Sequence, residues 1–174
     1  MSLLVIAYPE FSPGDLEQIQ RFRAVHDRLY YDVVAPHFTL VFPVGNIPED
    51  EFIGEARTKA ATTRSFSFVL RYAIINKDAF SPMYHTFLIP DEGNSNFIRL
   101  HDVLYRGRLS EHLRLDIDYI PHIGVGNNTD PQVCKQMADE WNATGFNIRG
   151  SIHSLTVVSY EHNKVSVLEV IPLR

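Results

Sequence analysis

The sequence predicts an α+β fold of two lobes, a duplicated bilobal arrangement in which two antiparallel-rich sheets face a central cleft and helices lie outside. Three observations support this prediction. Strand-like apolar runs alternate with amphipathic stretches along the chain, and the order strand, helix, strand, helix, strand occurs twice. A Pro-His pair stands at the equivalent place in each half, as Pro36-His37 and Pro121-His122. No Ser-, Gly- or Pro-rich linker divides the chain, so we expect residues 1–174 to form a single domain.

The first half is expected to hold three strands and two helices. Residues 3–8 (LLVIAY) form a short apolar run typical of a buried strand. Asp15 opens a helix that runs to about Leu29. Its apolar positions at helical spacing are Leu16, Ile19, Phe22 and Val25. Residues 37–44 are rich in β-branched and aromatic residues and predict a strand, residues 48–61 a helix with an acidic start, and residues 66–75 a further strand.

The second half repeats this order. Residues 84–89 (YHTFLI) predict a strand, and residues 94–106 a helix with apolar residues on one face. Residues 117–125 predict the strand of the second Pro-His pair, and Asp130-Pro131 begins a helix to about residue 143. Residues 146–160, with a bend, and residues 165–171 predict two strands joined as a hairpin.

Composition excludes several classes of protein. The 45% hydrophobic and 21% charged content is that of a folded globular protein, and no apolar run is long enough to span a membrane. The net charge of −5 does not suit a protein that wraps long nucleic acid. The start of the chain lacks the basic region of a signal peptide, and the single cysteine, Cys134, fits a reducing compartment. We therefore expect a cytoplasmic protein that acts as a monomer.

The two Pro-His pairs open similar segments, PHFTLV and PHIGVG. Because residues two apart on a strand share a face, His37 projects with Thr39, and His122 projects with Gly124. If the two lobes pack about a pseudo-twofold axis, both histidine faces meet in the central cleft. Two facing imidazoles suit in-line attack on a phosphodiester, one as base and one as acid, and a neighbouring hydroxyl can donate to the phosphoryl oxygens.

The segment His37-Phe38-Thr39-Leu40 resembles the His-apolar-Thr/Ser-apolar signature of the 2H phosphoesterase superfamily, which includes 2′-5′ RNA ligase-like proteins and cyclic phosphodiesterases. That family carries the signature twice, once in each lobe. The resemblance implies a metal-independent phosphodiesterase acting on a 2′,3′-cyclic phosphate or 2′-5′ linkage of a small nucleotide or RNA end, without a cofactor. It implies that His37 and His122 are the acid–base pair, in an order left open, and that Thr39 binds phosphoryl oxygen.

Gly124 departs from this signature because it stands where the second Thr or Ser belongs. Three interpretations are open: a bulge or close backbone approach, a backbone N–H that replaces the hydroxyl, or a site that binds without turnover. The last makes the protein a non-catalytic nucleotide- or RNA-end-binding module.

Tyrosines on neighbouring strands are further candidates for binding a base, although aromatic residues on strands usually belong to the core. These are Tyr8, Tyr84 and Tyr119. His85 lies on the same strand as Tyr84 and can face either the core or the cleft. No metal-binding motif, Gly-rich phosphate loop or nucleophile elbow is present in the sequence.

Overall fold

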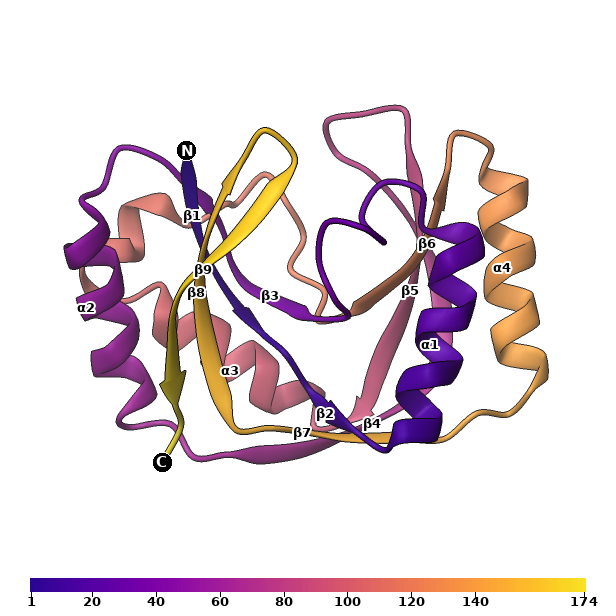
Figure 1. Ribbon diagram of the computed structural model, residues 1–174, viewed down its shortest axis with the longest axis horizontal. Coiled ribbons are helices and arrows are strands. Elements are labelled where there is room, and N and C mark those ends of the chain that lie inside the picture. The colour runs from indigo at the N-terminus through magenta and orange to yellow at the C-terminus, as the bar shows by residue number, and fades with distance from the viewer.

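The computed structural model describes residues 1–174 and contains two antiparallel sheets flanked by helices (Figure 1). Sheet A has the order β3-β1-β8-β9, with bounds Phe38–Val44, Ser2–Ala7, Ser154–Glu161 and Lys164–Pro172. Sheet B has the order β2-β7-β4-β5-β6, with bounds Glu10–Phe11, Ile148–Ile152, Phe66–Lys77, Tyr84–Glu92 and Ile123–Asn128. The predicted α+β class with two antiparallel sheets is confirmed.

Each sheet takes strands from both halves of the sequence. In sheet A, β1 and β3 from the first half join β8 and β9 from the end of the chain. In sheet B, β4 from the first half lies between β7 and β5. The chain passes from sheet B to sheet A at His153, where the predicted bend in residues 146–160 occurs. Each of the two Pro-His motifs nevertheless belongs to a different sheet, since His37 precedes β3 of sheet A and His122 precedes β6 of sheet B.

Four helices cover the sheets: α1 (Pro13–His26), α2 (Glu49–Ala60), α3 (Asn94–Leu104) and α4 (Pro131–Ala143). Helix α2 packs on sheet A, α1 and α4 pack on sheet B, and α3 contacts β3 and β5 and so touches both sheets (Figure 1). Ser12 Oγ accepts from the Asp15 N–H at the start of α1, and Asp130 Oδ1 accepts from the Gln132 N–H at the start of α4. These caps satisfy amides that have no partner within the helix.

The buried face of α1 differs from the predicted one. Ile19 is fully buried as expected, but Leu16 and Val25 are 41% and 66% exposed. The next buried position along the helix is Arg23, which is only 2% exposed. The predicted apolar positions were therefore wrong at both ends of α1. The helix instead turns the charged side chain of Arg23 toward β6 and toward the loop that follows α1.

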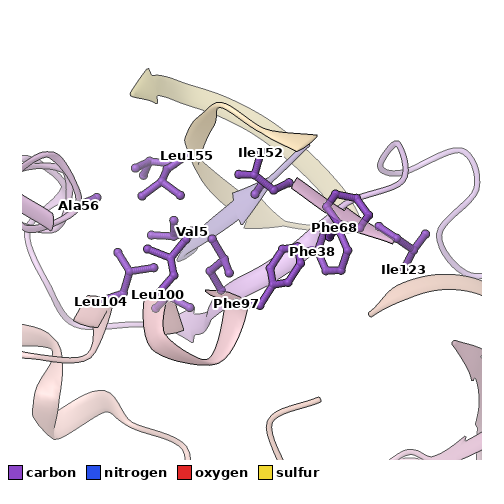
Figure 2. Packing of buried hydrophobic residues seen from close by; sticks show 14 of the residues in the cluster. Val5, Phe38, Ala56, Phe68, Phe97, Leu100, Leu104, Ile123, Ile152 and Leu155 are labelled. Carbon is purple, nitrogen blue, oxygen red and sulfur yellow. The ribbon is translucent and has the colours of Figure 1, made fainter. Parts of the chain in front are cut away.

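One hydrophobic core joins the two sheets. Phe38 of β3, Phe68 of β4 and Phe97 of α3 are mutually packed, with Phe38 and Phe97 ring centroids 4.0 Å apart (Figure 2). Burying a side chain of this size contributes about 1.5–3 kcal/mol. The aromatic cluster includes Phe38 of the first histidine motif, so the core holds the start of β3 in place.

Three local features differ from the expected elements. Strand β6 begins at Ile123 rather than at residue 117, so the preceding residues are irregular. The two-residue strand β2 and a 3₁₀ helix at Gly107–His112 were not predicted, because such short elements carry almost no periodic signal. None of the helices is long and apolar enough to cross a membrane.

Candidate active site

His37 stands at the entry to β3, and alternation along the strand sets the direction of its neighbours. Phe38 and Leu40 are fully buried in the core. His37 and Thr39 are half-buried and lie on the opposite face. The ring of Tyr8 lies edge-on to the imidazole, with centroids 6.3 Å apart. The first motif thus presents an imidazole and a hydroxyl on one face, with Tyr8 beside them.

His122 stands at the entry to β6 in the same way. Ile123 and Val125 are fully buried, whereas His122 and Gly124 are half-buried. The imidazole of His122 stacks on the ring of Phe87 from β5, with centroids 3.5 Å apart and planes 15° from parallel. An aromatic face therefore fixes the plane of the second imidazole.

The two histidines are held by equivalent hydrogen bonds. His37 Nδ1 donates to the Ala35 carbonyl at 2.9 Å, and His122 Nδ1 donates to the Ile120 carbonyl at 2.5 Å. In each case the acceptor is two residues earlier in the chain. A carbonyl oxygen can only accept, so Nδ1 carries the proton and Nε2 of the neutral ring keeps its lone pair. Both motifs therefore leave Nε2 available for proton transfer.

Burial dominates the electrostatics of both imidazoles. It lowers the pKa of His37, an effect that Arg23 reinforces and that the carbonyl bond and Asp27 oppose. Burial also lowers the pKa of His122 to about 4, and the charges of His37 and His85 act in the same direction. The charge of His37 is thus one of the causes of the lowered pKa of His122. Both rings are neutral at pH 7 in the free protein.

Thr39 lies on β3, an edge strand of sheet A whose outer side is covered by side chains. The Tyr119 hydroxyl donates to the Thr39 carbonyl at 3.3 Å, and His101 Nδ1 donates to the Leu40 carbonyl at 2.9 Å. The rings of Tyr119 and His101 stack with centroids 3.6 Å apart. Tyr119 therefore supports the strand that carries Thr39, and its ring already has a stacking partner other than a base. Thr39 Oγ1 makes no hydrogen bond within the protein.

Tyr84 does not share a face with the histidines. Alternation along β5 places it with Thr86, whose hydroxyl donates to the Cys134 carbonyl of α4 at 3.1 Å. The opposite face of β5 carries His85 and Phe87. The structure thus turns the predicted Tyr84 toward the helix layer and brings its neighbour to the site.

His85 is the residue that the sequence left undecided. Its Nε2 lies 3.3 Å from Asp78 Oδ2, and its ring is near-parallel to Phe87, with centroids 5.7 Å apart. On its other side lies Tyr30, whose ring centroid is 6.4 Å away. Tyr30, His85, Phe87 and His122 therefore form a row of aromatic rings ending at the catalytic candidate. The period-two spacing of His85 and Phe87 was the only sequence signal for this row.

Gly124 has open space where a side chain would begin, since no atom lies within 4 Å of a Cβ built there. It pairs with Phe87, and the β5–β6 register shifts at this point, which marks a bulge. The glycine of β6 that packs closely is Gly126, where a Cβ would lie 2.6 Å from Met137 Sδ and 3.2 Å from His26 Cβ. The bulge interpretation of Gly124 fits, and the close-approach interpretation belongs to Gly126.

No group of three or more His, Cys, Asp or Glu side chains could hold a metal ion in this structure. The chemistry that the site residues offer is proton transfer by two imidazoles and hydrogen-bond donation by Thr39. These are the groups needed to move a proton onto and off a phosphate ester.

Comparisons with known proteins give the family and the fold. The family model described as "2'-5' RNA ligase superfamily" matches residues 11–164. A comparison with curated proteins gave no match. The solved structure of TT0787 of Thermus thermophilus is 17% identical, with a TM-score of 0.62 and coverage of 100% of this chain and 98% of that one.

Two further solved structures agree. E. coli LigT complexed with 3'-AMP is 17% identical, with a TM-score of 0.61 and coverage of 99% and 97% of the two chains. Kluyveromyces marxianus Usb1 is 13% identical, with a TM-score of 0.61 and coverage of 99% and 98%. At these identities the likeness establishes the fold.

Proposed function

The chain belongs to the 2′-5′ RNA ligase superfamily, and we propose that it is a metal-independent phosphodiesterase. Its substrate is a 2′,3′-cyclic phosphate or a 2′-5′ phosphodiester in a small nucleotide or at an RNA end. The fold and the superfamily, which is generally one of phosphoesterases, support this class of reaction.

The observation that carries the proposal is the matched pair of imidazoles. Each one donates Nδ1–H to the carbonyl two residues before it, so each directs a basic Nε2 away from its own strand. A single bond of this kind would also satisfy a structural histidine, but here the same bond occurs at the equivalent place in both motifs. A pair of proton-transfer groups needs this bond, because it sets the tautomer and the ring orientation.

The proposed reaction needs one imidazole in each protonation state. The neutral one takes a proton from water at Nε2 as the water oxygen attacks phosphorus. The bond from phosphorus to one ribose oxygen breaks, and the protonated imidazole gives that oxygen its Nε2 proton. The product is a phosphomonoester and a free hydroxyl, and both histidines have exchanged protonation states. The anionic phosphate favours the imidazolium form that the free site disfavours.

Thr39 is the proposed donor to the phosphoryl oxygens. Its hydroxyl projects on the same face as His37 and has no partner inside the protein, so it can donate as charge builds on those oxygens. Gly124 offers no second hydroxyl, which leaves room on the side of His122. Tyr8 lies edge-on to His37, and Tyr30 lies beside His85 at the far end of the row of rings from His122. These two tyrosines are the proposed contacts for the base.

The nucleotide character of the substrate draws support from E. coli LigT, whose structures contain 3'-AMP, NADP+ and ATP. Those ligands are small. The net charge of −5 likewise favours binding of a small nucleotide in a local pocket over binding along a long nucleic acid. We also propose that the protein acts as a cytoplasmic monomer.

The test is hydrolysis of a panel of 2′,3′-cyclic nucleotides, 2′-5′ dinucleotides and ADP-ribose 1″,2″-cyclic phosphate in the presence of a chelator, followed by 31P NMR. His37→Asn and His122→Asn retain an amide that can donate to the same carbonyl but have no Nε2, so both should abolish turnover while folding is kept. His112→Asn, in the 3₁₀ helix, is the matched control and should keep wild-type turnover.

The alternative function is a nucleotide-binding module without turnover, which the missing hydroxyl at Gly124 favours. It predicts binding of the same cyclic nucleotides with no product. Wild-type turnover by both histidine variants would refute the two-imidazole mechanism.

A further inference from the structure

Helix α1 buries a charged residue and leaves apolar residues exposed. Arg23 is 2% exposed, while Val25 on the same helix is 66% exposed. A buried ion pair is often no more stabilising than apolar side chains of similar volume. Conflicts of this kind between local pattern and final fold tend to mark functional positions. The contacts of Arg23 therefore need an explanation beyond stability.

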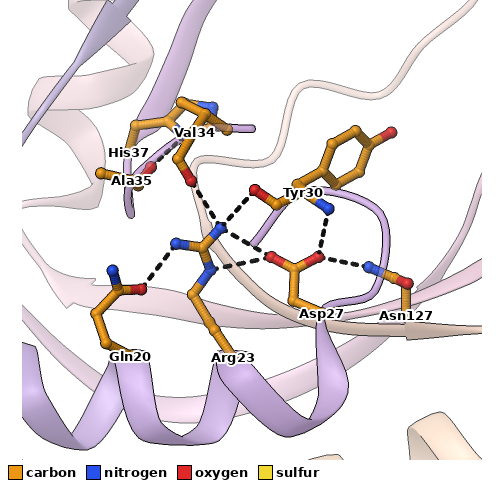
Figure 3. A network of polar contacts seen from close by, with 8 residues as sticks. All are labelled: Gln20, Arg23, Asp27, Tyr30, Val34, Ala35, His37 and Asn127. Atoms are coloured by element: carbon orange, nitrogen blue, oxygen red, sulfur yellow. Dashed lines mark hydrogen bonds and ion pairs between the residues drawn. The ribbon is translucent and has the colours of Figure 1, made fainter. Parts of the chain in front are cut away.

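The guanidinium of Arg23 ties α1 to the loop that leads to the first histidine (Figure 3). Its Nη2 donates to the Val34 carbonyl at 2.8 Å and to the Tyr30 carbonyl at 3.2 Å. The next residue after Val34 is Ala35, whose carbonyl accepts the Nδ1–H of His37. The position of the His37 ring thus depends on a loop that Arg23 holds at two points.

The carboxylate of Asp27 ties the same helix to the strand of the second histidine. Its Oδ2 accepts from Arg23 Nε at 3.0 Å, and its Oδ1 accepts from Asn127 Nδ2 of β6 at 2.6 Å and from the Tyr30 N–H at 3.1 Å (Figure 3). Asp27 and Asn127 are 4% and 3% exposed, so water does not compete for these bonds. His122 directly precedes β6, the strand on which Asn127 lies.

We propose that Arg23, Asp27 and Asn127 form a positioning unit that sets His37 and His122 relative to each other. The unit is the polar connection between the loop before β3 and strand β6, which belong to different sheets. It also places Tyr30 beside His85, because Asp27 and Arg23 bind the backbone N–H and carbonyl of Tyr30. The kinetic part of the proposal rests on the proposed function, whereas the structural part does not.

The arginine fork suits this role in a way that other side chains do not. Nε, Nη1 and Nη2 of Arg23 all have partners, including Gln20 Oε1 at 2.9 Å. A planar group that is bonded on several sides fixes direction as well as distance. A lysine would place one charge at one point and leave loop carbonyls without a donor.

The test compares Asn127→Ala and Arg23→Met with Arg21→Met. Asn127→Ala keeps the ion pair and removes only the link to β6. Arg21→Met removes an exposed pair with Glu17 from the same helix and is the matched control. The readouts are kcat and KM on the 2′,3′-cyclic nucleotide that the wild type hydrolyses best, the melting temperature, and the imidazole Nδ1–H signals of both histidines by NMR.

Asn127→Ala should lower kcat on the order of 10²-fold with KM changed less than about threefold, because misplacement by about 1 Å costs this much in rate. Arg23→Met should likewise lower kcat with little change in KM, and it should also have a lower melting temperature. Arg21→Met should match the wild type in all three quantities. The Nδ1–H signal of His122 should shift or broaden in Asn127→Ala.

Folded Asn127→Ala with wild-type kcat and unchanged imidazole signals would overturn the positioning role. A purely structural role would lower the melting temperature and leave kcat per folded molecule unchanged. If the wild type hydrolyses nothing, the proposed function fails, and the imidazole signals of Asn127→Ala alone decide whether the unit positions the histidines. If Arg23→Met does not fold, the result for Asn127→Ala alone decides whether the positioning role holds.

Discussion

The ring of Phe87 lies flat against the imidazole of His122, with centroids 3.5 Å apart and planes 15° from parallel. This contact removes water from one face of the imidazole and so contributes to the burial that lowers its pKa to about 4. The first motif has no equivalent, since Tyr8 meets His37 edge-on at 6.3 Å. The repeated motifs are alike in their hydrogen bonds and different in their aromatic contacts.

Phe87→Leu should raise the pKa of His122 from about 4 toward the ordinary value of 6.5, because the imidazole gains solvent on the face that the ring covers. An NMR pH titration of the imidazole signals measures this shift. Tyr72→Leu, an exposed aromatic on β4, should leave the pKa of His122 unchanged. An unchanged value in Phe87→Leu would show that the stack does not set the pKa.

Thr39→Val should lower kcat/KM by about 10²–10³-fold, since it removes a hydrogen-bond donor to the phosphoryl oxygens and keeps the shape of the side chain. Thr39→Ser retains the hydroxyl and should keep most of the activity. Steady-state kinetics of both variants, with melting temperatures, check this. Equal activity in the valine and wild-type proteins would remove Thr39 from the mechanism.

Gly124→Ser should fold normally and raise kcat, because its Cβ enters open space and its hydroxyl restores the donor that the second motif lacks. Kinetics on the best cyclic nucleotide measure the change. A fall in kcat with an unchanged melting temperature would mean that the substrate occupies the space beside Gly124.

Gly126→Ser is the contrasting change on the same strand. Its Cβ would lie 2.6 Å from Met137 Sδ and 3.2 Å from His26 Cβ, so the Met137 side chain must shift and His26 must give way slightly. We expect a loss of about 1–3 kcal/mol in the free energy of unfolding, measured by urea denaturation. A melting temperature equal to that of Gly124→Ser would contradict this packing.

The activity should be greatest below pH 6.5. The reaction needs one neutral and one protonated imidazole, and burial lowers the pKa of both in the free protein. The protonated fraction therefore falls as pH rises through these lowered values, and kcat/KM falls with it. A pH profile of kcat/KM checks this, and a maximum above pH 7 would contradict the lowered pKa values.

His122 should also make the protein less stable in acid. Its pKa is about 4 in the folded protein and about 6.5 in the unfolded chain, so the unfolded chain binds more protons between these values. The free energy of unfolding should fall as pH drops from 6.5 to 4, by on the order of 2 kcal/mol at pH 5. Urea denaturation of His122→Asn should show a pH dependence weaker by this amount.

Local pattern was enough to predict much of this protein. Turn residues and periodicity identified the main strands and helices, and alternation correctly placed Phe38 and Ile123 in the core behind the two histidines. These properties depend on neighbours one to four residues apart, so a linear sequence displays them. The repeated Pro-His pair pointed to both candidate catalytic residues for the same reason.

Contacts between distant residues settled the rest. Tyr119 donates to a carbonyl 80 residues away, and Asn127 donates to Asp27 across 100 residues. Such pairings decide three features of the fold: the burial of Arg23, the choice of His85 over its neighbour to face the site, and the strands that share each sheet. A buried charge is stable only once its partners are in place, and those partners come together only in the folded chain.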